Sequence, residues 1–217
     1  MAYTTIHLVR HGQVDNPQHL LYERLPGFHL SSRGRRMAAA TAEYIAADPQ
    51  MKKAVALYSS PLERTQETAQ VIQSALNNRR ESDNSLGILT DQRVIEAGNN
   101  FRGRRIGYGE GALWRNGNWR LVLNLWKPSW GESYRSIARR VGAFVYEKVD
   151  QYPGQQVIAV THESPIWTFR HLLETGRAEH NMLLRHTALA SVTSLTFETG
   201  THKLMDINYV DPAAEVK

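Results

Sequence analysis

A repeated alternation of short apolar runs with helical segments is the feature that most constrains the fold of this 217-residue chain. The apolar runs are rich in β-forming residues and lie at 3–9, 54–59, 88–96, 156–161, 190–198 and 202–210. Helical periodicity marks the segments 33–47, 61–76, 132–150 and 165–173. Strands that alternate with helices are typical of a sheet covered on both faces. We therefore expect an α/β fold, a three-layer α/β/α sandwich with a mostly parallel central sheet and helices on both faces.

Capping residues predict where two of the helices begin. Either Ser31 or Ser32 suits the N-cap of the helix over 33–47. For the next helix, Ser60 suits the N-cap, Pro61 the first helical position and Glu63 the end of a capping box. We therefore expect this helix to follow the preceding strand directly.

The domain organisation is predicted from length and from one irregular segment. The chain has no internal repeat or low-complexity linker, and its length suits one α/β domain, so we expect a single domain over 1–217. The segment 97–131 breaks the alternation and is rich in Gly, Arg and Trp. We interpret it as a cap-like excursion over one face, and its aromatic side chains are best explained by packing of the excursion onto the sheet.

Composition excludes several classes of protein. No apolar run approaches the roughly 20 residues that span a bilayer. The first residues do not resemble a signal peptide, so we expect a cytoplasmic protein without membrane contact. The chain has no cysteine, which excludes disulfides, thiolate chemistry and cysteine-type zinc sites.

The net charge of +5 raises the question of an anionic partner. Nucleic acid would need a continuous basic surface. The basic residues are instead spread along the chain, with only short clusters at 35–36, 79–80 and 102–105. We therefore expect no nucleic-acid partner, and we expect a few arginines to serve an anionic small molecule.

The first apolar run ends in Arg10-His11-Gly12. A neutral imidazole is a competent nucleophile towards phosphorus, and a neighbouring cation stabilises the oxygens of a transferring phosphoryl group. Glycine allows a close backbone turn at the end of the strand. The tripeptide therefore suits phosphoryl chemistry, but it is also compatible with a histidine that merely ends a strand.

Two further runs end in the same manner. Arg64 lies in the first turn of the predicted helix after 54–59, where free N–H groups and the helix dipole already favour an anion. Its planar fork matches phosphate oxygens. His162 ends the run 156–161 just before another helix. Taken alone, each of these residues is more economically explained as structural.

Together, the three strand ends predict a site. The carboxyl ends of parallel strands lie on one edge of a sheet, and ligands bind there. Arg10, His11, Arg64 and His162 are therefore expected to converge on a pocket suited to a dianion.

With these motifs, the sequence resembles the histidine phosphatase superfamily, also called the phosphoglycerate mutase-like family. The resemblance is carried by Leu8-Val9-Arg10-His11-Gly12, by the block 59–69 and by Thr161-His162. Weaker matches are the segment 25–31 with Gly34, and Gly131-Glu132-Ser133. The matches follow the family's order and span most of the chain.

The resemblance implies roles for individual residues. His11 would be the phosphorylated nucleophile, and Arg10, Arg64 and His162 would form the phosphate pocket. Glu96, in Val94-Ile95-Glu96-Ala97-Gly98, best fits the family's proton donor, although it is also compatible with a strand-end surface carboxylate. The family's chemistry implies no metal and no cofactor.

The sequence departs from the family pattern at several positions. Gln13 fits a family substrate-binding position, whereas Val14 replaces a hydroxyl residue. Asn16 falls one place before the family's asparagine, so its role as a substrate ligand is open. Glu163 follows His162 where many members have glycine. We expect its carboxylate to point away from the phosphate.

These observations favour a phosphatase that acts on small-molecule phosphate monoesters. Phosphoglycerate mutase-type transfer is the alternative, and a metal hydrolase and a non-catalytic phosphate-binding module are rivals from other classes. Arg102 and Arg105 are candidates to bind a second negative group of the substrate. The sequence identifies neither the substrate nor the oligomeric state, and it leaves a homodimer open.

Overall fold

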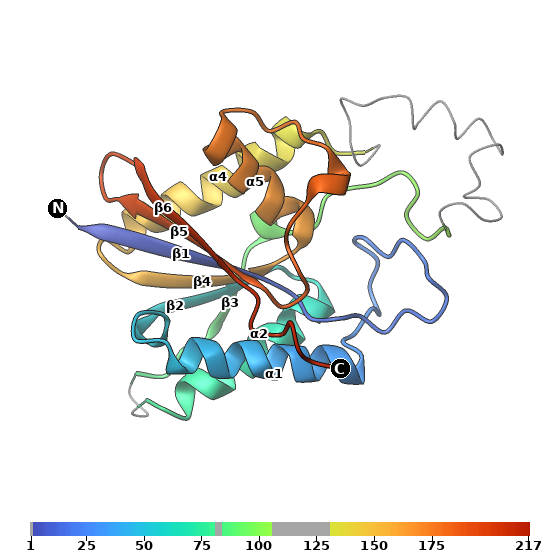
Figure 1. Ribbon diagram of the computed structural model, residues 1–217, viewed down its shortest axis with the longest axis horizontal. Helices are drawn as coiled ribbons and strands as arrows, with labels where there is room; N and C mark the ends of the chain where they lie inside the picture. The colour runs from blue at the N-terminus through green and yellow to red at the C-terminus, as the bar shows by residue number, and fades with distance from the viewer. Residues whose placement is uncertain (1, 81–83, 106–130) are drawn as a thin grey trace.

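The computed structural model describes residues 2–80, 84–105 and 131–217, and they form a twisted sheet with helices on both faces (Figure 1). The described strands lie in the order β3-β2-β4-β1-β5-β6. Their bounds are β1 (Tyr3–Arg10), β2 (Ala56–Ser59), β3 (Ile88–Thr90), β4 (Gln156–Thr161), β5 (Val192–Glu198) and β6 (Leu204–Val210). Strands β3, β2, β4 and β1 pair in parallel, while β5 is antiparallel to both β1 and β6.

The helices form the outer two layers. On one face lie α1 (Ser32–Ala47) and α2 (Glu63–Asn77), and on the other lie α4 (Tyr134–Gln151) and α5 (Glu163–Thr175) (Figure 1). Short 3-10 turns occur at η1 (Met51–Lys53), η3 (Gln92–Val94) and η5 (Met182–Leu184). The predicted three-layer α/β/α sandwich with a mostly parallel sheet is therefore confirmed.

The alternation of side chains along β1 explains the two covered faces. Ile6 and Leu8 are fully buried in the cluster that includes the apolar face of α4. Val9 is fully buried in the opposite cluster, with residues of α1 and α2. Successive side chains of a strand point to opposite faces, and each such buried side chain contributes about 1.5–3 kcal/mol. This burial on both sides holds the end of β1, and hence the following histidine, in place.

The start of α1 was predicted correctly as one of two alternatives. Ser31 is the N-cap, and its side chain accepts a hydrogen bond from the backbone N–H of Gly34. The helix then runs from Ser32 to Ala47.

The start of α2 was predicted wrongly. The N-cap is Leu62, without a side-chain hydrogen bond, and the helix begins at Glu63. The Ser60 hydroxyl, expected to cap the helix, lies 2.8 Å from Nε2 of His162. Oε1 of Glu63 accepts from the N–H of Gly27 instead of closing a capping box. Contacts with distant segments thus replace the local capping signal.

Two other boundaries also differ from the prediction. The expected strand over 88–96 ends at Thr90, because Asp91 caps the start of the turn η3, where its side chain accepts from the N–H of Arg93. Helix α5 begins at Glu163 rather than at Pro165. Proline is tolerated there because N–H groups in the first turn of a helix have no intrahelical acceptor.

The predicted excursion falls only partly on described residues. Residues 106–130 lie outside them, so the cap-like role of 97–131 and the single domain stay predictions. The described part, 97–105, lies against the loop that follows β1. Leu21 donates to the carbonyl of Arg104 and accepts from the N–H of Gly103, both at 2.9 Å. These two loops form one wall of the region beyond the strand ends.

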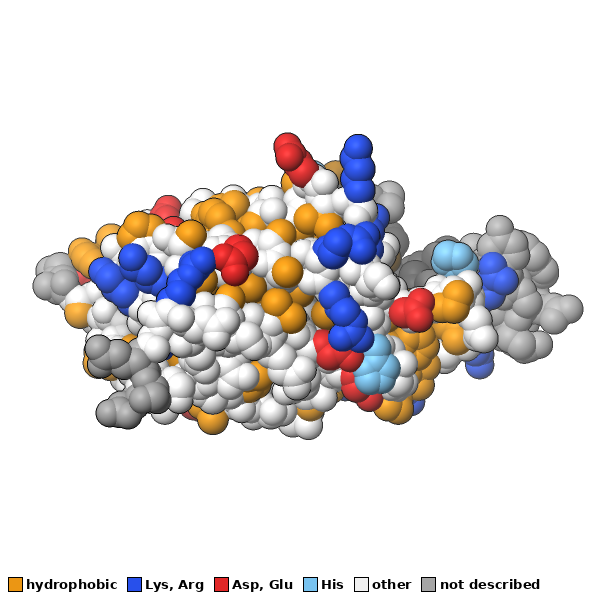
Figure 2. All heavy atoms as spheres, turned by 90° about the horizontal axis from the view of Figure 1, so that it is seen from below, with side chains coloured by type: hydrophobic (Ala, Val, Ile, Leu, Met, Phe, Trp, Pro, Cys, Tyr) orange, Lys and Arg blue, Asp and Glu red, His pale blue; other side chains and the backbone are white. Residues whose placement is uncertain are grey.

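The described surface bears on the expectations about membranes and nucleic acid. Within the described ranges, no helix is long and apolar enough to cross a membrane. On the face in Figure 2, the described lysines and arginines are interspersed with acidic, hydrophobic and uncharged side chains. Two of the arginines in the short basic clusters are paired with carboxylates, Arg79 with Glu43 at 2.6 Å and Arg35 with Glu67 at 3.5 Å.

Candidate active site

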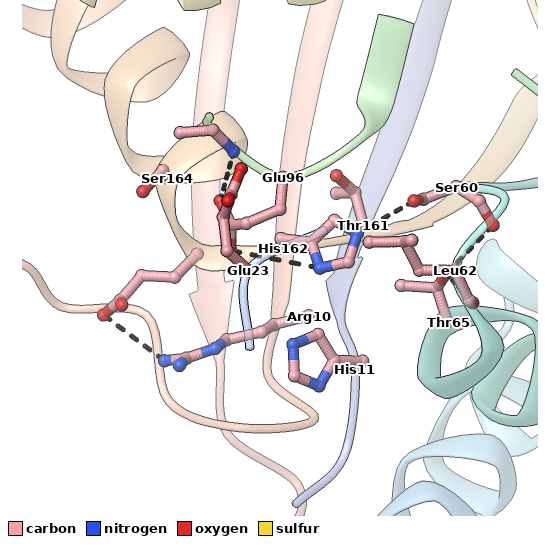
Figure 3. A network of polar contacts seen from close by, with 12 residues as sticks. Arg10, His11, Glu23, Ser60, Leu62, Thr65, Glu96, Thr161, His162 and Ser164 are labelled. Carbon is pink, nitrogen blue, oxygen red and sulfur yellow. Dashed lines mark hydrogen bonds and ion pairs between the residues drawn. The ribbon is translucent and has the colours of Figure 1, made fainter. Parts of the chain in front are cut away.

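The candidate site lies at the carboxyl ends of β1, β2 and β4. Arg10 pairs in register with Thr161, so His11 and His162 leave adjacent strands side by side. The N–H of His11 continues the pairing and donates to the carbonyl of Thr161 at 3.1 Å. Figure 3 shows Arg10, His11, His162 and Glu96 gathered at this edge. The convergence expected from the strand ends is observed.

Close packing of the backbone fixes the turn after His11. A Cβ atom at Gly12 would lie 2.4 Å from the carbonyl oxygen of Gly34, and one at Gly34 would lie 1.9 Å from that of Gln13. Neither position has room for a side chain. The N–H of Gly12 also donates to the hydroxyl of Thr68 at 3.3 Å. The strand end is thereby held against the start of α1 and against α2.

The hydrogen bonds of His11 define its tautomer. The side chain is buried, and Nδ1 lies 2.7 Å from the carbonyl oxygen of Gly12. A carbonyl only accepts, so Nδ1 carries the proton and Nε2 keeps its lone pair. The Nε–H of Arg64 donates to this lone pair at 3.3 Å. The unprotonated nitrogen of His11 therefore faces a guanidinium group.

The electrostatic surroundings keep His11 neutral. Burial, and then the charges of Arg64 and Arg10, hold the pKa of His11 well below its ordinary value of 6.5. Each of these causes disfavours the imidazolium. At neutral pH the ring is therefore uncharged.

Arg64 is fully buried in the first turn of α2 and joins the two histidines. Its Nη2 donates to the backbone carbonyl of Glu23 and lies 3.3 Å from Nδ1 of His162. Its guanidinium carbon lies 4.8 Å from the centre of the Tyr22 ring. Nη1 is buried and has no hydrogen-bond partner among the described residues. A buried donor without a partner is costly, so an anion placed here would gain a strong contact.

His162 lies opposite His11, with ring centres 5.2 Å apart. Arg64 can only donate, so Nδ1 of His162 accepts and Nε2 donates to the Ser60 hydroxyl at 2.8 Å. Burial, Arg64 and then His11 hold the pKa of His162 well below 6.5. The second histidine is therefore also neutral.

Arg10 is held by two oxygens at its Nη1. This nitrogen donates to the carbonyl of Thr187 and lies 3.3 Å from Oε1 of Glu163. The Nε atom is buried and without a partner among the described residues. The expectation that Glu163 points away is therefore wrong, because the carboxylate turns to Arg10.

Glu96 lies on the loop after η3, with one carboxylate oxygen held and one directed at the histidines. Oε1 accepts from the N–H of Ala97 at 2.8 Å, and Oε2 lies 3.9 Å from Nδ1 of His162. The backbone carbonyl of Glu96 accepts from Arg24 at 2.7 Å and from Arg140 at 3.4 Å. The carboxyl group is thus positioned from outside the pocket.

Glu132 organises that outer support. Its carboxylate pairs at 2.8 Å with Arg24 and at 2.8 Å with Arg140. Although its partial burial acts to raise the pKa of Glu132, the two arginines lower it below the ordinary value. The sequence contains only a weak signal for this role, the match at Gly131-Glu132-Ser133.

Two predicted substrate ligands are used within their own loop. Oε1 of Gln13 accepts from the hydroxyl of Ser31 at 2.9 Å, which supports the cap of α1. Both amide atoms of Asn16 bond the backbone of Leu20, at 2.8 and 3.0 Å. In this structure Asn16 therefore closes a turn, and a contact with substrate stays a prediction for both residues.

The two predicted rim arginines lie at the edge of the site. Arg102 is 54% exposed, and its Nε lies 3.9 Å from Oε2 of Glu23. Arg105 is exposed on the same loop. The contact of Arg102 with Glu23 does not connect it to the histidines, and the role of both arginines towards a second anionic group stays a prediction.

Sequence reasoning missed Glu23. The residue is buried, has a φ of 40° and lends its carbonyl to Arg64. Burial raises the pKa of its carboxyl group, while Arg24 and Arg102 oppose that rise. The left-handed backbone conformation of Glu23 costs free energy for a non-glycine residue. A single sequence offers no signal for this, because the conformation depends on the meeting of two loops.

The arrangement is suited to a tetrahedral oxyanion. Two guanidinium groups carry buried donors that no described residue accepts from, a neutral imidazole presents a lone pair, and a carboxyl group lies nearby. Such groups bind a phosphoryl group and stabilise its transition state. Among the residues that the structure describes, no cluster of three or more His, Asp or Glu side chains is arranged to hold a metal ion.

Comparisons with known proteins agree with this geometry. The family model described as the histidine phosphatase superfamily (branch 1) matches residues 6–210. An uncharacterized protein of Mycobacterium tuberculosis is 42% identical over 212 residues, which are 97% of this chain and 98% of that protein. A 2,3-bisphosphoglycerate-dependent phosphoglycerate mutase of Thermoplasma acidophilum is 29% identical over 202 residues, 89% of this chain and 87% of the mutase. The structure of mycobacterial glucosyl-3-phosphoglycerate phosphatase aligns with a TM-score of 0.72 at 22% identity, over 95% of this chain and 97% of that one.

Proposed function

The chain belongs to the histidine phosphatase superfamily, and from this premise we propose that it hydrolyses small-molecule phosphate monoesters through a phosphohistidine at His11. Members of the superfamily are phosphatases or mutases, so membership supports an enzyme of phosphoryl transfer. Hydrolysis, rather than transfer back to the substrate, is the proposal.

One observation carries the proposal. Nδ1 of His11 donates its proton to the Gly12 carbonyl at 2.7 Å, which leaves Nε2 as an unprotonated nucleophile. Next to it lies Arg64, whose Nη1 has no partner among the described residues. Attack on a phosphate dianion requires both a nucleophilic lone pair and a cationic donor for the phosphate oxygens, and these two groups supply them.

In the first step, Nε2 of His11 attacks phosphorus in line and forms the N–P bond as the P–O bond to the leaving group breaks. Arg10 and Arg64 stabilise the charge on the three equatorial oxygens. The leaving oxygen takes the proton of Glu96. Several charge-assisted hydrogen bonds of roughly 1.5–3 kcal/mol each lower the barrier.

In the second step, water attacks phosphorus on phospho-His11. Glu96, now a carboxylate, takes a proton from the water, the N–P bond breaks and inorganic phosphate leaves. His162 supports both steps. A phosphoryl oxygen can take the place of Arg64 next to Nδ1 of His162. The ring then changes tautomer, so that Nε2 accepts from the Ser60 hydroxyl and Nδ1–H donates to the phosphoryl oxygen.

The proposed reaction needs no metal ion or cofactor, because the two guanidinium groups offset the phosphate charge. We also propose a cytoplasmic location. The mutase is the alternative, and the relationship to the Thermoplasma mutase is the observation that favours it. A mutase would require a bisphosphorylated cofactor and would return the phosphoryl group to the substrate.

The test is hydrolysis of para-nitrophenyl phosphate in EDTA by wild type and by His11→Ala. We expect turnover by the wild type and its loss in the variant, with acid-labile phosphate on His11 in quenched reactions. A panel of natural monoesters then ranks the substrates. Labelling of His11 together with phosphoglycerate interconversion and no net hydrolysis would establish the mutase instead. Activity that persists in His11→Ala would refute the phosphohistidine.

A further inference from the structure

A carboxylate faces the phosphate-binding edge at a position where repulsion would be expected. Glu163 is the first residue of α5, directly after His162. Its Oε1 lies 3.3 Å from Nη1 of Arg10, and its side chain is 32% exposed. The first turn of a helix favours a carboxylate, which explains why the residue is stable there. It does not explain why the carboxylate turns towards Arg10.

We propose that Glu163 competes with the phosphoryl group for Arg10 and thereby limits how tightly the site holds inorganic phosphate. This inference rests on the proposed function. Glu163 pairs with Arg10 between turnovers, leaves it when phosphate binds, and returns as the product departs. It acts on the reaction through the charge of Arg10.

The charges close to the pocket support this role. His11 and His162 are neutral, and the positive charges that act on His11 are those of Arg64 and Arg10. Glu163 offsets one of these two charges. Inorganic phosphate makes the same contacts as the phosphoryl group of a substrate, so two uncompensated arginines would also retain the product. A carboxylate paired with one of them weakens that retention.

The structure also shows that this pair is built to exchange. Arg10 keeps a second acceptor, the Thr187 carbonyl, so the guanidinium stays in place when Glu163 leaves. Glu163 makes one ion pair with the described residues, at 3.3 Å, and its side chain is partly exposed, so solvent can receive its carboxylate. Glu132, by contrast, pairs at 2.8 Å with both Arg24 and Arg140 and is about half as exposed, at 15%. Glu132 is a fixed support, whereas Glu163 is a replaceable partner.

The experiment compares inhibition by inorganic phosphate in wild type and Glu163→Gln. Glutamine keeps an acceptor for Arg10 but removes the charge. We expect the inhibition constant for phosphate to fall roughly three- to tenfold, about 0.65–1.4 kcal/mol in binding free energy, because the charge that competes for Arg10 is removed. The fall should be larger at low ionic strength. Glu174→Gln is the matched control, since Glu174 lies on the same helix and pairs with Arg170 at 2.8 Å, so its constant should not change.

The outcomes separate this inference from the proposed function. A constant that is unchanged or raised in Glu163→Gln, in an enzyme that hydrolyses para-nitrophenyl phosphate, overturns the competition and leaves the phosphatase intact. A raised constant would mean that Glu163 positions Arg10. If no substrate is hydrolysed, calorimetric binding of inorganic phosphate to both proteins measures the same difference. Glu163→Ala, which removes the competing acceptor altogether, should bind phosphate at least as tightly as Glu163→Gln, because the Thr187 carbonyl still holds Arg10. Weaker binding by Glu163→Ala than by wild type would overturn the competition.

Discussion

The floor of the site and its rim are built in different ways. The floor consists of Arg10, His11, Ser60, Arg64 and His162, which follow strands or open helices and are mostly buried. The rim consists of the loops 20–28 and 97–105, joined by backbone hydrogen bonds between Leu21 and residues 103 and 104.

The difference teaches where chemistry and selectivity reside. Parallel strand ends and helix starts hold the floor within a packed sheet, as reacting groups require. The rim arginine Arg102 is 54% exposed, and its ion pair with Glu23 within the described part of the chain is long, at 3.9 Å. We infer that the floor determines the reaction and that the rim selects the substrate. Changes to the floor should therefore lower kcat for every ester, and changes to the rim should alter KM for some of them.

Glu96, where floor and rim meet, gives the largest expected effect. Glu96→Gln removes the proposed proton donor but keeps the acceptor for the N–H of Ala97. We expect kcat for alkyl phosphates to fall about 10²–10⁴-fold, because general acid catalysis contributes that much. The loss should be smaller for para-nitrophenyl phosphate, whose leaving group needs less protonation. Steady-state kinetics on both esters measure the difference, and equal losses would contradict the role of proton donor.

Arg64→Lys tests the geometry of the floor. Lysine keeps the charge but cannot reach His11, His162 and the Glu23 carbonyl at once, as the guanidinium does. We expect a fall in kcat of roughly 10²–10³-fold, which is typical for the loss of one oriented donor. The control is Arg35→Lys, an exposed arginine paired with Glu67, which should be unaffected. A fall of less than tenfold would mean that charge alone suffices at this position.

The contrast between floor and rim also explains what the sequence could predict. The strand ends that deliver His11 and His162 follow from local patterns, because an apolar run followed by a helix start is visible within a few residues. The wrong start of α2 shows the limit of such patterns. Ser60 has a good local capping signal, but it bonds His162, a residue 102 positions away.

The supports that escaped prediction all join distant segments. Glu132 pairs with both Arg24 and Arg140. Glu23 pairs with Arg102 of the loop 97–105, and Glu163 pairs with Arg10. Each depends on which loops the sheet brings together. Residue type alone does not specify that, so the chemistry of the floor was easier to predict than the network that positions it.

Neutral histidines in the floor predict a dependence of stability on pH. The pKa values of His11 and His162 lie well below 6.5 in the folded protein, while unfolded histidine titrates near 6.5. Below that pH the unfolded chain binds more protons, so stability present above pH 6.5 is lost as the pH falls. The loss approaches roughly 1.4 kcal/mol per pH unit for each histidine.

Urea unfolding at pH 7.5, 6.5 and 5.5 measures this dependence. His11→Asn should lower the slope between pH 6.5 and 5.5 by about one histidine's share, up to 1.4 kcal/mol per unit. A free energy of unfolding that does not change over this range would mean that these rings accept protons in the folded protein. The pH dependence of kcat/KM should agree with this. Protonation of His11 abolishes its nucleophile, and because its pKa lies well below 6.5, the fall in kcat/KM that this protonation causes should occur below pH 6.5.

Arg102 gives the smallest and most selective expected effect, and it tests the rim directly. Arg102→Ala removes an exposed guanidinium that contacts no floor residue, so turnover of para-nitrophenyl phosphate should change less than about twofold. A monoester that also carries a carboxylate should show a rise in KM of about three- to tenfold at low salt, because one partly exposed charge pair is lost. Arg79→Ala, another exposed arginine paired with a glutamate, should change neither substrate. If both esters respond equally to Arg102→Ala, the second anionic group is not read at this residue, and selectivity must be sought elsewhere on the rim.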